Sequence, residues 1–227
     1  IASKYQVGSH TMNHQLVWQQ SREAFKEDVS SSIKLLEDIT GQKVEAFRAP
    51  GFSIRESEGW AIEILHELGI RMDSSVFPAH HVHGGMPSYV SAVPSWVEYN
   101  GIRMKEFPIV YRKIWGKHIV FSGGGYFRLV PYRLLRKWTR ECPEYLLAYI
   151  HPRDLDAEQP MIEDLNYIRR FKSYYGLRGA EEKLKRWLMD FDFMDLRTAD
   201  GLIDWKAAPI VEITPSLCSA TNLRSQS

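Results

Sequence analysis

Apolar residues recur at helical spacing along much of the chain. Five stretches place them three or four positions apart, the spacing of one helix face: residues 25–36, 60–68, 132–142, 161–175 and 180–191. In the first stretch, Phe25, Val29, Ile33 and Leu36 form an apolar stripe that predicts a helix ending near Gly41. Each stretch therefore predicts an amphipathic helix with one face packed on a core.

Short apolar runs that leave through Gly, Pro or polar residues lie between these stretches. They are residues 43–51, 70–75, 117–127, 144–152 and 192–199, and each predicts a strand. Residues 80–112 combine Pro87, Pro94 and Pro108 with alternating apolar positions, which favours an irregular insertion or a hairpin. Because strands alternate with helices, the sequence predicts parallel βα units in an α/β fold, either a barrel or an open sheet. One domain over residues 1–215 and a disordered tail over 216–227 are expected.

The charge balance narrows the classes of partner. The chain has 29 Lys and Arg against 28 Asp and Glu, a formal net charge of +1, which indicates neither a nucleic-acid-binding surface nor a polybasic membrane patch. Cys142 and Cys218 lie far apart, which argues against a disulfide framework and a zinc ribbon. No apolar run approaches the roughly 20 residues that span a bilayer, so we expect no membrane span. A cytoplasmic location is also expected, but because the chain begins at Ile1 rather than Met, the lack of a signal peptide does not support it.

Histidines supply the candidate metal and acid–base chemistry. His10 and His14 stand four residues apart in the segment HTMNH, and two imidazoles on one helical turn can hold a single zinc ion. The same spacing also occurs on exposed helices that bind nothing. His151 follows the apolar run at residues 144–150, at the place where a parallel strand presents catalytic groups. The alternative for His151 is a histidine at the edge of the core that bonds a backbone carbonyl.

Three further candidates follow predicted strands. Arg48 could hold a carboxylate through two hydrogen bonds or lie on the surface, and Gly51 could let a backbone N–H approach a ligand or complete a Pro-Gly turn. Asp73 could orient a neighbouring Arg or His, or could cap a helix. Because the carboxyl ends of parallel strands meet at one edge, we expect these three residues to lie near the candidate histidines.

Two other motifs have simpler interpretations. The histidines at positions 80, 81 and 83 occupy a loop rich in Pro and Gly with no carboxylate close by, so we expect solvated side chains. The run Gly123–Gly125 could form an anion-binding nest, but no Lys-Ser or Lys-Thr pair follows it as in a phosphate loop. Tight turning of the chain is the favoured explanation of the glycines.

The insertion at residues 80–112 also carries aromatic side chains. Trp96, Tyr89 and Tyr99 could form a stacking platform for a sugar ring. They could equally pack the insertion onto the rest of the fold, which is the interpretation that we favour.

Four short segments occur in the order of the motifs of a known family. HTMNH, FRAPGF, DSSVFP and YIHPRD resemble, in order and approximate spacing, the polysaccharide deacetylase family with the NodB-homology domain. The resemblance extends from Val7 to Ala199. The segment GGGYFRLVPYRLL resembles a branch of that family associated with bacterial exopolysaccharide or surface-glycan synthesis. Membership implies a distorted (β/α) barrel that uses one divalent metal, most often zinc, to remove acetyl groups from N-acetylated and less often O-acetylated sugars of a polysaccharide.

The resemblance assigns a role to each candidate. His10 and His14 match the metal-binding histidines, and Arg48 matches the arginine that holds the catalytic carboxylate. Gly51 stands where the family more often has a tyrosine whose backbone N–H helps to bind the oxyanion. Asp73 matches the supporting aspartate.

His151 matches the general acid of the family. A bound zinc ion lowers the pKa of its water toward ~7 and polarises the acetyl carbonyl, so the implied reaction is hydrolysis through a tetrahedral oxyanion. Departure of the amine then needs a proton. His151, tuned by a carboxylate such as Asp73, is expected to supply it, because an imidazole near neutral pKa suits this task.

One family motif has no counterpart in the chain. The family carries paired aspartates on its first strand, as general base and third metal ligand, and they would precede Ile1. We therefore expect an N-terminally incomplete barrel with an open edge, weak zinc binding and slow turnover. Two alternatives stay open: a catalytically inactive barrel that binds a glycan or a partner protein, and a metal-dependent hydrolase of another C–N amide bond.

Overall fold

The protein is described by a computed structural model that covers residues 2–80, 83–142 and 144–214. These residues form two compact units, the first within Ile1–Ser91, Ser95–Glu106 and Trp205–Ser227 and the second within Ala92–Pro94 and Phe107–Asp204. His81, Cys218 and the expected tail at 216–227 lie outside the described residues. Along the chain, the second unit is therefore an insertion into the first.

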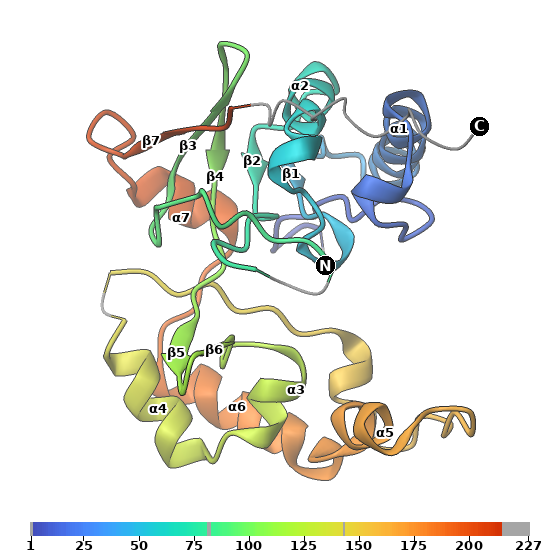
Figure 1. Cartoon of the computed structure of the whole chain (residues 1–227), viewed down its shortest axis with the longest axis vertical. Coiled ribbons are helices and arrows are strands. Elements are labelled where there is room, and N and C mark those ends of the chain that lie inside the picture. The colour runs from blue at the N-terminus through green and yellow to red at the C-terminus, as the bar shows by residue number, and fades with distance from the viewer. Residues whose placement is uncertain (1, 81–82, 143, 215–227) are drawn as a thin grey trace, which may run out of the picture. The chain divides into compact units, whose positions relative to one another are not determined.

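The elements of each unit follow the chain in order and are labelled in Figure 1. The first unit contains α1 (Arg22–Thr40), α2 (Trp60–Glu67), the 3-10 turns η1 (Val17–Gln19), η2 (Pro50–Phe52) and η3 (Glu56–Glu58), and the strands β1 (Ala46–Phe47), β2 (Met72–Asp73), β3 (Ser95–Tyr99), β4 (Ile102–Glu106) and β7 (Ile210–Glu212). The second unit contains β5 (Arg112–Ile114), β6 (Lys117–Ile119), α3 (Gly124–Leu129), α4 (Tyr132–Arg140), η4 (Pro152–Asp154), α5 (Tyr167–Tyr174), η5 (Leu177–Gly179), α6 (Ala180–Asp190) and α7 (Leu196–Leu202).

Helix α1 begins and ends at the residues that its sequence indicates. Ser21 caps its start by accepting a hydrogen bond from the Ala24 N–H, and Gly41 ends it in the left-handed region at a φ of 67°. Phe25 and Val29 are fully buried on its inner face. The predicted stripe is thus confirmed. Helices α2, α4, α5 and α6 confirm the other helical stretches, α5 over a shorter range than predicted.

The sheet of the first unit has the strand order β1-β2-β4-β3-β7. Strands β1, β2 and β4 are parallel neighbours, and β3 runs antiparallel to β4 and parallel to β7. The register places Phe47 beside Asp73, and Asp73 beside Glu106. The last residues of three parallel strands therefore lie at one edge of the sheet, where α/β folds hold their reactive side chains.

The fold is mixed α/β with a parallel sheet, as predicted, and the β3–β4 hairpin confirms the hairpin expected within residues 80–112. Among the described residues, the sheet ends at β1 and β7, with one further parallel bridge from Ser9 to Phe47. Closure into a distorted barrel stays a prediction. None of the helices in the described part of the chain combines the length and the apolar character that crossing a membrane requires.

A separate core holds the second unit together. Phe121, Phe127, Leu135 and Trp187 are fully buried in it. The Trp187 Nε1 donates a hydrogen bond of 3.0 Å to Thr139 Oγ1, which ties α6 to α4 and leaves the buried indole N–H satisfied.

Three strands predicted for this part of the chain are wrong or shorter than expected. Residues 117–127 form a strand only over Lys117–Ile119, and the glycine run opens α3. Residues 144–152 make a single bridge, between Tyr149 and Gly123, because the chain turns into α3 directly after Gly123. Residues 192–199 lead into helix α7, because Asp195 caps it by accepting a 2.9 Å hydrogen bond from the Thr198 N–H.

Gly123 is required by the close approach of the segment that carries Tyr149. An added Cβ would lie 2.2 Å from the Tyr149 carbonyl oxygen, which belongs to backbone held by a 3.1 Å hydrogen bond from the Tyr149 N–H to the Ser122 oxygen. We expect Gly123→Ala to lower the free energy of unfolding by about 1–3 kcal/mol, measured by urea denaturation. Gly179→Ala is the control, because its Cβ would meet nothing within 4 Å. Equal stability of the two variants would contradict this explanation.

Candidate functional site

His10 and His14 lie on a loop, so the helical turn that both interpretations of this pair assumed is wrong. Thr11 and His14 adopt positive φ angles of 65° and 54°, which break any helical path. Asp28 of α1 holds the loop by accepting hydrogen bonds from the backbone N–H groups of Met12 (3.2 Å) and Asn13 (2.9 Å). The helix therefore sets the shape of the loop that carries both imidazoles.

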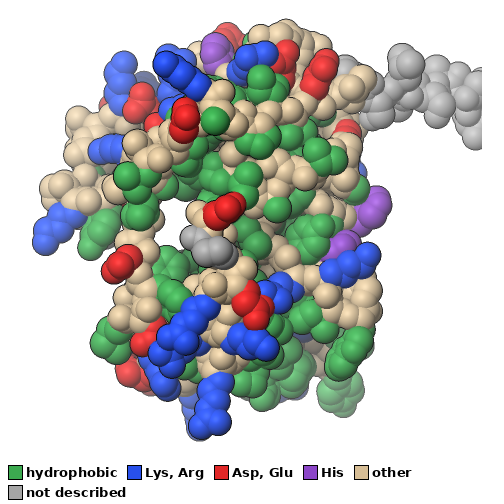
Figure 2. All heavy atoms as spheres, turned by 90° about the vertical axis from the view of Figure 1, so that its left-hand side faces the viewer, with side chains coloured by type: hydrophobic (Ala, Val, Ile, Leu, Met, Phe, Trp, Pro, Cys, Tyr) green, Lys and Arg blue, Asp and Glu red, His purple; other side chains and the backbone are tan. Residues whose placement is uncertain are grey.

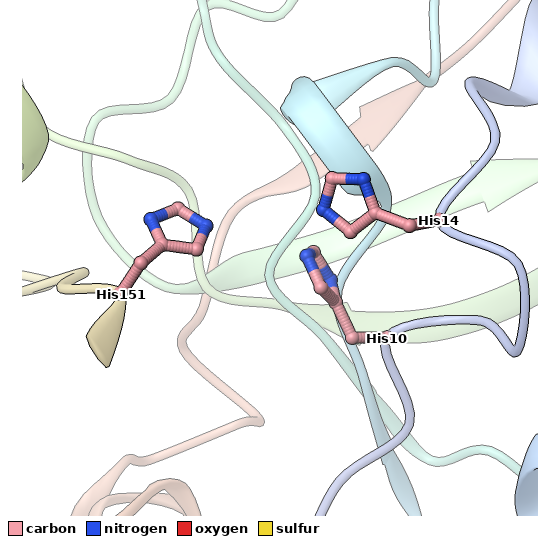
Figure 3. Close-up of side chains that lie close together, drawn as sticks. All are labelled: His10, His14 and His151. Carbon is pink, nitrogen blue, oxygen red and sulfur yellow. The ribbon is translucent and has the colours of Figure 1, made fainter. Parts of the chain in front are cut away.

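The two imidazole rings face one another at the surface of the first unit. Their centroids are 5.0 Å apart and their planes make an angle of 74° (Figure 3). The His10 Nδ1 lies 2.6 Å from the Arg48 carbonyl oxygen, which can only accept, so Nδ1 carries the proton and the lone pair is on Nε2. Metal-binding histidines commonly donate their second ring N–H to a carbonyl in this way. The two imidazoles thus have the donor chemistry that a divalent cation requires.

Arg48 and Gly51 follow β1 on a turn beside this pair. The Arg48 Nε donates to Ser74 Oγ at 2.9 Å and to the Ser74 carbonyl oxygen at 3.3 Å, so the strand end of β2 orients the guanidinium. Gly51 has a φ of 63°, and a Cβ on it would lie 3.0 Å from His83 Cβ. The glycine is therefore needed both for its backbone conformation and for the space that it leaves.

Asp73 ends β2 and is 1% exposed. The Ser75 hydroxyl donates a hydrogen bond of 2.5 Å to Asp73 Oδ1, and a second carboxyl group, that of Glu106 at the end of β4, lies beside it. Burial raises the pKa of Asp73 to about 6, against the hydrogen bonds from Ser75 and Glu106 and the charge of Arg48, which lower it. Burial and the neighbouring Asp73 also raise the pKa of Glu106 well above its usual value.

The sequence interpretation missed Glu106, although a signal for it was present. Strand β4 alternates so that Met104 and Glu106 are both buried. A glutamate at an inward position at the end of a strand is unusual, because a buried carboxyl group needs a partner.

His151 lies in the second unit, at the start of η4. Its backbone N–H donates to Asp154 Oδ2 at 3.1 Å, and its Nδ1 is 3.6 Å from the same oxygen. Burial would raise the pKa of Asp154, but the hydrogen bonds from His151 and the charge of Arg128 outweigh burial and lower it. The carboxylate that faces His151 within its own unit is therefore Asp154, whereas Asp73 bonds Ser75 and Glu106.

Arg128 of α3 completes this arrangement and was also missed. It is 6% exposed and lies 3.2 Å, through Nε, from Asp154 Oδ1. Its two terminal nitrogens donate to the carbonyl oxygens of Lys172, Ser173 and Tyr175 at 2.9–3.0 Å. One buried cation thus joins Asp154 to the end of helix α5.

Lys and Arg side chains gather on one face of the second unit, over α4 (Figure 2). A groove of about 420 Å³ on this face is lined by Arg133, Arg136, Lys137, Arg140 and Arg186, together with Tyr132 and Glu141. Asp190 pairs with Arg136 at 3.1 Å, and Glu141 lies 3.9 Å from Lys137. The groove has the chemistry to hold an anionic group. The net charge of the whole chain did not reveal it, because acidic residues, including Glu141 in the groove itself, balance these cations.

The remaining candidates have structural roles. Trp96 stacks edge-on against Trp205 at 5.2 Å and donates from Nε1 to the Trp205 oxygen, while Tyr89 and Tyr99 are 2% and 7% exposed. These contacts confirm that the aromatic residues of the segment 80–112 pack that segment onto the rest of the fold. His80 and His83 are exposed, as expected for the loop histidines that the structure describes.

Comparisons with known proteins agree with the motifs. Residues 2–72 match the sequence model of the family described as polysaccharide deacetylase, and residues 74–200 match that of a domain of unknown function, DUF3473. No curated protein sequence matches the chain.

Two solved structures are similar in fold. A Mycobacterium smegmatis protein assigned as a polysaccharide deacetylase shares 13% identity at a TM-score of 0.58, over 91% of this chain and 65% of its own. A 4-alpha-glucanotransferase from Thermococcus litoralis shares 13% identity at a TM-score of 0.54, over 92% of this chain and 30% of its own. The chain thus spans less than two thirds of either protein. The DUF3473 model covers more than half of the chain, so the chain belongs to the DUF3473 family, and its residues 2–72 match the polysaccharide deacetylase family model.

Proposed function

We propose that the protein is a metal-dependent hydrolase that removes acetyl groups from N-acetylated sugars of a polysaccharide or a surface-glycan precursor. One observation carries the proposal: His10 and His14 face each other at 5.0 Å, and the Arg48 carbonyl holds the Nδ1 of His10. This pair lies within the residues that match the polysaccharide deacetylase model.

In this proposal His10 and His14 hold the cation, which is expected to be zinc because imidazole nitrogen is a preferred zinc ligand. A bound divalent cation would supply polarisation of the acetyl carbonyl and activation of water. Arg48, oriented by Ser74, holds a carboxylate at the site, and the Gly51 backbone N–H helps to bind the oxyanion. These roles follow the family motifs residue by residue.

His151 is proposed as the proton donor to the departing amine. Asp154 accepts from its backbone N–H and lies 3.6 Å from its Nδ1, which favours a ring orientation with Nε2 directed away from Asp154. The Arg128 guanidinium in turn keeps Asp154 ionised. The pair therefore keeps the imidazole in place for proton transfer from Nε2.

The test is acetate release from N-acetylated chito-oligosaccharide by the zinc-loaded protein. Slow acetate release is expected, and His151→Ala is expected to lower kcat by about a further 10²- to 10⁴-fold with zinc content unchanged. His118→Ala, in the same unit, is the control and should keep full activity.

Other outcomes would replace the proposal. Tight binding of the oligosaccharide without acetate release would favour a glycan-binding module. Release from small amides alone would favour another C–N hydrolase. Loss of zinc in His151→Ala would contradict the proton-donor role and make His151 a metal ligand.

A further inference from the structure

A second carboxyl group lies beside Asp73 and has no place in the mechanism above. Glu106 ends β4 and Asp73 ends β2, and the parallel register pairs them directly. Glu106 is fully buried and Asp73 is 1% exposed. Neighbouring strands are about 4.8 Å apart, so side chains at paired positions on one face lie in contact. The two carboxyl groups therefore lie side by side in one buried space.

Two buried carboxylates in contact cannot both carry a charge, so one of them keeps a proton. The Glu106 Oε1 accepts a hydrogen bond of 3.0 Å from the Val76 N–H. Among the residues that the structure describes, none offers an N–H or O–H donor to the buried Glu106 Oε2, which fits an oxygen that itself donates. Asp73, by contrast, accepts a hydrogen bond from the Ser75 hydroxyl, and this bond favours its charged form. The proton accordingly resides on Glu106 and is donated to Asp73.

Ser75 connects Asp73 to the turn after β1 through two hydrogen bonds. Because the Ser75 hydroxyl donates to Asp73, its oxygen is left to accept, and it accepts the Ala49 N–H at 2.8 Å. The neighbouring Ser74 accepts a hydrogen bond from the Arg48 side chain, so the segment after β2 is hydrogen-bonded to both residue 48 and residue 49.

The same turn orients the candidate metal ligand. The Arg48 carbonyl oxygen, which belongs to the same peptide group as the Ala49 nitrogen, is the acceptor for the His10 Nδ1–H at 2.6 Å. A shift of this carbonyl would release the ring of His10 and allow its other tautomer.

We propose that Glu106 is a positioning residue for the candidate metal site, acting through Asp73 and the turn that carries Arg48. The inference rests on the metal site of the proposed function. Its predictions differ from those of a glutamate that merely fills the core, because they concern the proton and the hydrogen bond rather than the volume.

Three variants separate these roles. Glu106→Gln keeps a donor toward Asp73 and an acceptor for the Val76 N–H, so it is expected to behave as the wild type. Glu106→Leu fills the space without a donor. It is expected to fold, but Asp73 and Ser75 are then expected to position the turn at residues 48 and 49 less firmly. Glu98→Leu, on β3 with a side chain 22% exposed, is the matched control for the same chemical change.

The first measurement uses metal-free protein and does not depend on the proposed function. Imidazole nitrogen NMR is expected to report the Nδ1–H tautomer of His10 in the wild type and in Glu106→Gln, and a mixture of tautomers in Glu106→Leu. The second measurement is the affinity for zinc alone. It is expected to fall by about 10- to 100-fold in Glu106→Leu and to stay unchanged in Glu106→Gln and Glu98→Leu.

Each result decides the matter. A folded Glu106→Leu protein that keeps the wild-type tautomer of His10 would overturn the inference. If wild type binds no zinc but the tautomer shifts as expected, the proposed metal site fails and the positioning role of Glu106 stands. If Glu106→Leu does not fold, Ser75→Ala replaces it, since it removes a single hydroxyl from the same path. A wild-type tautomer in Ser75→Ala would likewise overturn the inference.

Discussion

The double variant His10→Ala/His14→Ala is expected to lose zinc affinity by more than about 100-fold and to release no measurable acetate. Both imidazoles are removed from the pair whose rings are 5.0 Å apart, so no nitrogen ligand is left on the loop. Because His14 is exposed and His10 is only partly buried, the fold is expected to be retained. Isothermal titration with zinc and metal analysis after dialysis measure the effect.

A second pair of histidines provides the control for this double variant. His66→Ala/His80→Ala removes two exposed imidazoles from the same unit and is expected to bind zinc as the wild type does. Undiminished zinc binding by His10→Ala/His14→Ala would show that zinc binds elsewhere on the protein, and would contradict the proposed function.

Arg128→Ala is expected to lower the free energy of unfolding by about 3–5 kcal/mol at neutral pH. The substitution leaves the Asp154 carboxylate, whose side chain is 7% exposed, without its cation, and it strips a donor from three backbone carbonyl oxygens. Urea denaturation followed by tryptophan fluorescence measures the loss, because Trp187 reports on the same core. Arg169→Ala, at an exposed position on α5, is the control and should stay within about 0.5 kcal/mol of the wild type.

The pH dependence gives this prediction a second check. The folded pKa of Asp154 is lowered, so its stabilising contribution is present above the pKa of the unfolded chain and is lost as the pH falls through the folded value. Once Asp154 is protonated, Arg128 no longer neutralises a buried charge. The difference in stability between wild type and Arg128→Ala should therefore shrink below about pH 4. A difference that is constant with pH would show that the carbonyl contacts alone matter.

Much of the fold could be predicted because helices are specified by nearby residues. The stripe from Phe25 to Leu36 and the end at Gly41 are both local signals, and α1 follows them. Strands depend on distant partners, so the same reasoning misplaced them. The apolar run at residues 144–152 has the composition of a central strand, yet it finds a partner only at Gly123. At residues 192–199 the cap formed by Asp195 outweighs the apolar residues before it.

The residues of the candidate site also differ in how far the sequence alone could identify them. Motif spacing identified His10 and Arg48, and the hydrogen bond between them shows that the first unit brings these two residues together. Glu106 lies 33 residues after Asp73, and only the parallel register of β2 and β4 brings them side by side. Arg128 and Asp154 are likewise joined only by the path of the chain between α3 and η4. A pair of this kind cannot be identified from one segment, because its two residues lie far apart in the sequence.

Strand β7 comes from the far end of the described chain, yet it pairs with β3 in the first unit. During synthesis the sheet therefore cannot be completed until the whole of the stretch Phe107–Asp204 has been translated. At the usual pace of about 5–20 residues per second, the ribosome needs on the order of 5–20 s for that stretch, long enough for the inserted unit to fold by itself. Throughout this interval β3 lacks its β7 neighbour, and an unpaired strand edge of this kind is a template for pairing with another chain.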